Sequence, residues 1–142
     1  MLKRTALLLM VALAVPATGC NRPDFTRPES AYISLARALQ KGDVKTAWNA
    51  VSTGTRTRLE ERAKAISAGS GGSLREEPAA LFFGGSEVAR PLKEVKLLRE
   101  EGNVATLSVV PEDGPPREVR MVKEKDGWKL DVSQDLQEQV AP

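Results

Sequence analysis

The sequence predicts an α+β fold in which about three N-terminal helices pack on a curved antiparallel sheet of about four strands. Apolar residues recur at helical spacing between positions 32 and 66, and from about position 92 they alternate with polar residues. Short turn signals separate the alternating segments, which favours strands joined as consecutive hairpins. With 142 residues, 41% hydrophobic and 28% charged, the chain has the size and composition of one globular domain.

Residues 1–19 have the pattern of a secretory signal peptide. The basic pair Lys3-Arg4 precedes an apolar run from Thr5 to Val15, and small residues follow. At about 1.5 Å per helical residue this run covers under about 20 Å, too short for the roughly 30 Å hydrocarbon core of a bilayer. We therefore expect a removable leader rather than a membrane-spanning helix.

The leader ends at Cys20, the one cysteine of the chain, in the order Ala17-Thr18-Gly19-Cys20. This ending resembles the lipobox of bacterial lipoprotein precursors, with Ala17 where leucine is commonest. The resemblance implies cleavage before Cys20, a diacylglyceryl thioether on its sulfur and acylation of the new amino group. Two or three such chains hold a protein firmly to a bilayer. The alternative is an ordinary signal peptide followed by a stray buried cysteine.

Asn21, directly after the cysteine, is the residue that predicts the location of the protein. An asparagine rather than an aspartate at this position resembles the pattern of lipoproteins that many Gram-negative bacteria export to the outer membrane. The resemblance implies a protein of the bacterial cell envelope, lipid-anchored in the outer membrane and facing the periplasm.

Charge and residue types restrict the functions that the chain can have. Residues 1–19 contain two of the 21 basic residues and none of the 19 acidic ones, so the chain from Cys20 onwards is formally neutral. A neutral domain exerts no general attraction on nucleic acid or anionic lipid, and we expect no nucleic-acid partner. With no histidine and one cysteine, histidine-based catalysis and histidine or multi-cysteine metal sites are excluded. We expect no metal and no cofactor.

Residues 20–28 are expected to form the lipidated cysteine and a short extended tether, because Pro23 and Pro28 stand among polar residues. At about 3 Å per residue the tether reaches about 25 Å, so the domain would lie close to the bilayer. Residues 29–142 show no internal repeat and are expected to form a single domain.

Three helices are expected at the start of the domain. The first follows a capping-box pattern of Thr26 and Glu29. Asp43 can cap the second helix, and the segment 52–57 the third. The alternative for segment 52–57, a catalytic nucleophile, lacks a partner base. The apolar stripes are Tyr32, Leu35, Ala36 and Leu39 in the first helix, Val44, Ala47, Trp48 and Val51 in the second, and Leu59, Ala63 and Ile66 in the third.

A flexible loop is expected at residues 69–73, which are all glycine or serine. The loop lacks the spacing of a phosphate-binding loop, and no strand precedes it. Residues 78–83 are expected to form a short apolar turn or helix, whose Leu81, Phe82 and Phe83 close an open end of the core.

Four strands complete the domain. Turn signals at residues 101–103, 111–116 and 126–127 separate them. The pair Asp126-Gly127 predicts a two-residue hairpin turn with positive φ at both positions. The strands are expected at residues 92–99, around Ala105, Leu107 and Val109, at 119–123, and around Trp128, Leu130 and Val132, with a polar tail from Ser133 to Pro142.

This order of helices followed by a curved sheet is similar to the nuclear transport factor two-like superfamily, also called the cystatin-like or α+β cone fold. Residues 31–65 resemble the opening of small bacterial lipoproteins of that type, through the phrase ALQKGDVKTAWNAVSTGTRTRLEERA, and DGWKLDVS resembles their closing strand. The resemblance implies the cone fold. It implies no single function, because the superfamily includes isomerases, dehydratases, polyketide cyclases and binding or assembly modules.

The residues give no catalytic constellation. Catalytic members of the superfamily use tyrosine, aspartate and often histidine inside the cone, whereas this chain has one tyrosine, Tyr32, on the apolar stripe of its first helix. The inward strand positions are apolar, and alternation is expected to turn Asp131 outward. The adjacent acids at 60–61, 76–77 and 100–101 point in different directions and are expected on the solvated surface. We predict no catalytic residue.

The aromatic residues are the one set that could mark a ligand pocket, because such pockets are lined by apolar and aromatic groups. The alternative is that they simply pack the core, which is the commoner role for large apolar side chains at helical spacing. The set comprises Tyr32, Trp48, Phe82, Phe83 and Trp128.

Three hypotheses of function follow. The first is a non-catalytic, lipid-anchored envelope lipoprotein that binds an envelope protein or a small apolar ligand. The second is an isomerase- or cyclase-like enzyme acting on a small apolar ligand, which expects a deep cavity reaching Tyr32 and a carboxyl of raised pKa inside it. The third is assembly through the exposed sheet face or an edge strand.

The anchor at Cys20 is directly testable. We expect mass spectrometry of the mature N-terminus to find acyl mass on Cys20, and Cys20→Ala to release the protein from the membrane fraction, because the acyl chains supply the membrane affinity. A Cys20→Ala protein that stays in the membrane fraction would contradict the prediction.

Overall fold

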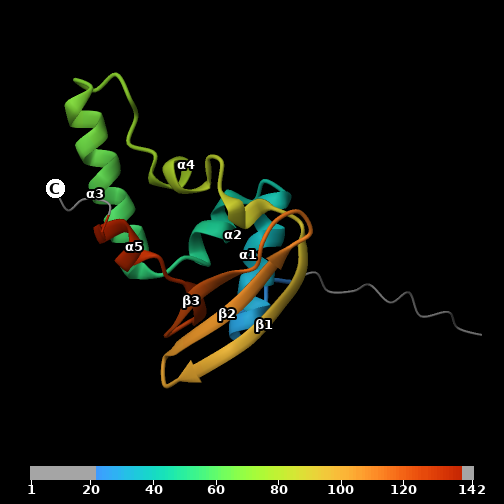
Figure 1. Ribbon diagram of the computed structural model, residues 1–142. Helices are drawn as coiled ribbons and strands as arrows, with labels where there is room; N and C mark the ends of the chain where they lie inside the picture. Colours follow the sequence, from blue (N-terminus) through green and yellow to red (C-terminus); the bar gives the residue numbers. More distant parts are fainter. Residues whose placement is uncertain (1–21, 139–142) are drawn as a thin grey trace, which may run out of the picture.

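Helices come first along the described chain and four consecutive strands follow, as the sequence predicts, with a last short helix after them (Figure 1). The structure, a computed structural model, describes residues 22–138; the predicted leader, Cys20, Asn21 and residues 139–142 lie outside them. The elements are α1 (Pro28–Gln40), α2 (Val44–Asn49), α3 (Thr53–Gly69), α4 (Pro78–Phe83), the 3-10 helix η1 (Glu87–Ala89), β1 (Leu92–Glu101), β2 (Val104–Pro111), β3 (Arg117–Glu124), β4 (Gly127–Leu130) and α5 (Ser133–Glu138).

The four strands form one antiparallel sheet in the order β1-β2-β3-β4, so each strand pairs with its neighbours in sequence. The predicted alternation is confirmed in β2, where Ala105, Leu107 and Val109 are buried and the residues between them are partly exposed. Met121 of β3 and Leu130 of β4 are paired and are both buried. One face of the sheet is therefore apolar and needs a cover.

Helix α1 supplies that cover. It lies behind the sheet in Figure 1 and contributes Ala31, Tyr32 and Leu35 to the same core cluster as the strands. Phe82 and Phe83 of α4 pack against this cluster, as expected, whereas the neighbouring Leu81 is exposed. The observed architecture is α+β, with helices packed on a four-stranded antiparallel sheet.

Helix α3 extends away from the sheet (Figure 1). Its buried residues are Thr55, Leu59 and Ala63, which lie in its first eleven positions, and its neighbours include α4 and α5. Of the predicted loop at residues 69–73, Gly69 is the last residue of α3, and residues 70–73 form a turn and a bend.

The predicted caps are partly confirmed. Asp43 accepts a hydrogen bond from the Thr46 amide at the start of α2, and Ser52 accepts one from the Thr55 amide at the start of α3. The capping box at α1 is wrong: the N-cap is Arg27, without a side-chain bond. Thr26 instead donates its amide and its hydroxyl to Asp24, two residues earlier. Thr26 therefore bonds to the nearby carboxylate of Asp24 and does not cap α1.

The turn predicted at Asp126-Gly127 is shifted by one residue. Glu124 pairs with Gly127, so Lys125 and Asp126 form the turn, and only Gly127 has a positive φ, of 119°. The reason is tertiary: the Trp128 amide donates to the carbonyl oxygen of Phe25 at 2.9 Å. A Cβ at residue 127 would lie 2.6 Å from that oxygen, so this close approach requires glycine.

The expected tether is largely part of the domain. Pro28 is buried as the first residue of α1, and the Asp24 amide donates to the Ser34 hydroxyl at 2.9 Å. Together with the bond from Trp128 to Phe25, this attaches residues 22–27 to α1 and β4. The sequence predicts a free spacer here because it shows prolines and polar residues, but not the partners that other elements offer.

Trp128 is the largest buried side chain and tests the core. It is 2% exposed, so we expect Trp128→Ala to lower the free energy of unfolding by about 3–5 kcal/mol in urea titrations of the chain from Cys20 onwards. Trp48 is only partly buried, and Trp48→Ala should cost less. Equal costs for the two substitutions would show that the core is misassigned.

Candidate functional site

The five aromatic residues that the sequence singles out divide into two groups. Tyr32 and Trp128 are buried in the core, at 0% and 2% exposure. Trp48, Phe82 and Phe83 are brought together as a partly buried cluster with edge-to-face rings: the Phe82–Phe83 centroids are 5.1 Å apart and the Trp48–Phe83 centroids 6.4 Å. The hollows described below are lined by other side chains.

Tyr32 has a polar partner within the core. Its hydroxyl accepts a hydrogen bond from the Arg117 guanidinium at 2.7 Å, and Glu87 lies 3.9 Å from the same guanidinium. Burial raises the pKa of Tyr32, and the charge of Arg117 opposes this shift only in part. The phenol therefore stays protonated and is held by a cation.

Asp131 does not face outward as predicted; it is 8% exposed. The hydroxyls of Ser52 and Thr55 donate to one carboxylate oxygen at 2.8 and 3.1 Å, and the Arg120 guanidinium lies 3.2 Å from the other. Strand alternation does not predict this burial, because Ser52 and Thr55 at the start of α3 cover Asp131, directly after the end of β4.

This carboxylate fastens α3 to the end of β4. Burial raises the pKa of Asp131, but hydrogen bonds from Ser52, Ser133 and Thr55 outweigh it and hold the pKa below the ordinary 3.8. Asp131 is therefore ionised at neutral pH, whereas the enzyme hypothesis expects a carboxyl of raised pKa. The serine and threonine act in capping and in this cluster, which is the role that the sequence favours for segment 52–57.

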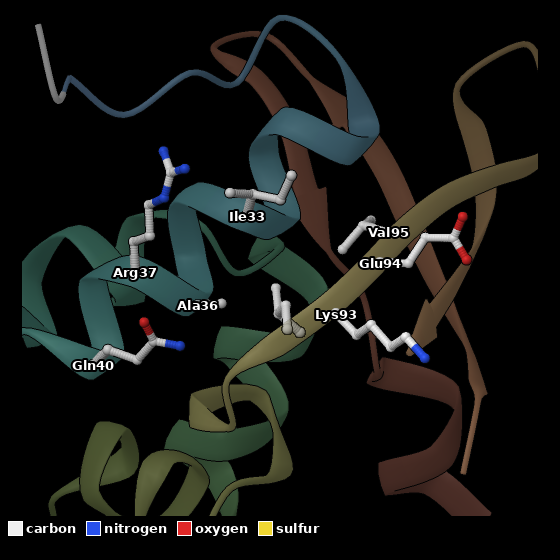
Figure 2. Close-up of a pocket in the computed structure, with 8 residues that line it drawn as sticks. Ile33, Ala36, Arg37, Gln40, Lys93, Glu94 and Val95 are labelled. Carbon is white, nitrogen blue, oxygen red and sulfur yellow. The ribbon is translucent and has the colours of Figure 1, made fainter. Parts of the chain in front are cut away.

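The candidate binding site is a groove between α1 and β1, shown in Figure 2. Its volume is about 260 Å³. Arg37 and Gln40 stand on the α1 side, and Lys93 and Glu94 lie along β1. The groove is lined by Ile33, Ala36, Arg37 and Gln40 from α1 and by Leu92, Lys93, Glu94 and Val95 from β1.

The groove has partly buried apolar residues and exposed charged residues in its lining. Ile33, Leu92 and Val95 are partly buried and supply apolar surface, whereas Arg37 and Lys93 are exposed. Helical periodicity sets the α1 wall, because residues 33, 36, 37 and 40 share one flank of the helix beside its buried stripe. The groove can therefore receive an apolar side chain between charged rims.

Strand β1 borders this groove with a free backbone edge. On the opposite edge of the sheet, the amides of Trp128 and Leu130 are bonded to the carbonyls of Phe25 and Ala50. Within residues 22–138, no backbone bond joins β1 to any segment besides β2. Its pairing with β2 shifts register after Leu92 and after Leu97, which leaves residues 94–97 as a regular stretch. Such irregularities restrict how long a strand can be added at this edge.

A second hollow lies between the end of α3 and α4. It has a volume of about 470 Å³, and Ile66, Leu74 and Leu81 contribute apolar surface to it. Leu74 and Leu81 are exposed. This hollow is not lined by any strand residue, so it offers side-chain contacts alone.

Comparisons of the chain with protein-family models, with curated proteins and with solved structures found no match. In the part of the chain from residue 22 to 138, no group of three or more acidic, cysteine or histidine side chains is arranged to hold a metal. No helix among the same residues is both long and apolar enough to cross a bilayer.

The ionised state of Asp131 predicts a pH dependence. Because its folded pKa is depressed, its stabilisation is present above the unfolded pKa of about 3.8 and is lost as the pH falls through the folded pKa. We expect Asp131→Asn to lower the free energy of unfolding at neutral pH by about 1–3 kcal/mol, since it leaves buried partners unsatisfied. Urea unfolding at neutral pH and at about pH 3 should show this deficit shrinking in acid, while the exposed Asp135→Asn shows little change at either pH. A deficit independent of pH would contradict the prediction.

Proposed function

We propose that this protein is a lipid-anchored lipoprotein of the bacterial envelope whose domain binds an extended segment of a partner protein without catalysing a reaction. The leader and Cys20 support the anchor. The groove beside the free edge of β1 is the observation that carries the binding role.

An extended segment fits this site because it can use both features at once. The edge of β1 offers unpaired amides and carbonyls, and these give affinity in strand addition. The groove receives alternate side chains, and these give specificity. Its volume of about 260 Å³ lies below the roughly 300–1,000 Å³ of small-molecule sites, so it suits one or two side chains better than a whole ligand.

The rims indicate the chemistry of the partner segment. Arg37 is an exposed cation on the α1 side of the groove and Lys93 is one on β1, and Glu94 is the acidic residue among the lining side chains. An apolar residue for the groove floor, flanked by an acidic residue for the rim, is therefore the favoured pattern. The regular stretch of residues 94–97 limits the pairing to about four residues on each strand.

The non-catalytic reading is supported by where the titratable core groups lie. Tyr32 is covered and bonded to Arg117, and Asp131 is covered and bonded to hydroxyls. Each therefore has a structural partner that accounts for its presence in the core.

Selection of peptides on the mature chain tests the groove. Peptides from a random displayed library should show an apolar residue beside an acidic one. Ile33→Lys, which puts a charge on the groove floor, should weaken their binding about tenfold or more, or about 1.4 kcal/mol. The matched control is Ile66→Lys, which alters the hollow between α3 and α4 and should leave binding unchanged. Hydrogen exchange should slow, when peptide is bound, at those amides of residues 94–97 that point away from β2.

The opposite pattern would refute the site. Peptides that lose affinity on Ile66→Lys and keep it on Ile33→Lys would place binding at the other hollow. Selected peptides without effect on the amides of β1 would exclude strand addition.

A further inference from the structure

The first described residue, Arg22, lies against the end of α1 and the start of α2. There it borders a hollow of about 150 Å³. The hydrogen bonds of Asp24 to Ser34 and of Phe25 to Trp128 hold the following residues, so the position of Arg22 on the domain is defined. The hollow is lined by Arg22, Pro23, Ser34, Arg37, Ala38, Lys41, Asp43 and Thr46.

Covalent geometry places this region near the bilayer once Cys20 is acylated. Two residues of chain span at most about 7 Å in any conformation. The headgroup layer of one leaflet is of similar depth, about 5–8 Å, since a bilayer of about 40–45 Å has a hydrocarbon core of about 30 Å. A lipidated Cys20 therefore holds Arg22 at the level of the headgroups.

The surface around Arg22 is basic. Arg22, Arg37 and Lys41 line the hollow and are exposed. The exposed Lys45 follows two positions after Asp43, which lines the same hollow. Within residues 22–138, none of the four lies within 4.0 Å of a carboxylate as an ion pair. The acidic residue in the lining is Asp43, whose carboxylate accepts the Thr46 amide at 3.0 Å as the cap of α2. The exposed Asp24, whose amide is bonded to Ser34 of the same lining, is a second carboxylate nearby, so the cations are in excess.

An exposed apolar side chain follows Asp43 of this lining in the sequence. Val44, between Asp43 and Lys45, is 48% exposed at the first position of α2. An exposed apolar residue beside cations is a combination suited to the boundary between headgroups and acyl chains.

We infer that this basic face, made of Arg22, Arg37, Lys41, Lys45 and Val44, seats on the phosphates of anionic lipids and fixes the orientation of the domain on the membrane. The inference rests on the proposed anchor at Cys20. Attraction between a cation and an anionic surface decays within a Debye length, about 10 Å at 0.1 M salt. The anchor keeps the basic face inside that distance, so these cations act although the mature chain is formally neutral.

The orientation is measurable on the full lipidated protein, because acylation blocks Cys20 and leaves an introduced cysteine as the single free thiol. A fluorophore on Val44→Cys should be quenched by a headgroup nitroxide lipid in vesicles containing phosphatidylglycerol. A fluorophore on Ser73→Cys, beyond the end of α3, should be quenched several-fold less. In pure phosphatidylcholine vesicles, or at about 0.5 M salt, the difference between the sites should shrink.

The second part of the experiment removes positive charges from the basic face. The triple variant Arg22→Gln, Lys41→Gln, Lys45→Gln should lower quenching at residue 44 to the level seen in phosphatidylcholine. Arg37 is left unchanged because it also lines the groove. The matched control removes the same charge elsewhere, at the exposed Lys64, Lys96 and Lys125, and should have no effect.

The outcomes separate the seating from the anchor. Protein that carries acyl mass on Cys20 and stays with the vesicles, but shows equal quenching at residues 44 and 73, overturns the seating and leaves the anchor intact. An equal loss of quenching in the control triple variant also overturns it, because the effect would then be one of net charge. Absence of acyl mass on Cys20 overturns the anchor, and the seating with it.

Discussion

Burial of the apolar stripe of α1 against one face of the sheet is the constraint on which the rest of the structure depends. Tyr32 and Leu35 share a core with Leu107 and Leu130, so the helix must lie along that face. Once the stripe is buried, the flank of α1 that carries Ile33 is left beside β1. The same placement brings the end of α1 next to the chain that enters the domain. The groove and the basic face are therefore two consequences of one packing arrangement.

The two edges of the sheet differ in whether other segments of the described chain hydrogen-bond to them. On the β4 edge, residues 25 and 50–52 supply backbone partners, and the absent side chain of Gly127 permits one of these approaches. On the β1 edge the described residues supply no backbone partner. The two register shifts in β1 protect this edge from pairing with a long strand of another chain. A short, regular and open stretch next to an apolar groove is a better surface for a short peptide than for a whole second sheet.

Arg37 links the two proposals, since it lines both the groove and the hollow beside Arg22. With the basic face on the headgroups, the groove would open close to the membrane surface. A partner segment bound along β1 would then be held beside the bilayer, within reach of other anchored or membrane-spanning proteins. Residues 20–142 are formally neutral although this local excess of cations exists, because opposite charges elsewhere on the domain cancel it.

The sequence by itself determined the type and order of the elements and the caps at Asp43 and Ser52, because periodicity and capping depend on residues only a few positions apart. It also determined the buried apolar positions of β2, but not those of β4, where Lys129 is buried between Trp128 and Leu130 and the strand ends before the expected Val132. Only the tertiary structure decided the burial of Asp131, the turn before Gly127 and the attachment of residues 22–27. Each of these depends on a partner far away in the chain, as do the groove and the basic face. Local pattern carries no information about such partners, since they become neighbours only when the core has formed.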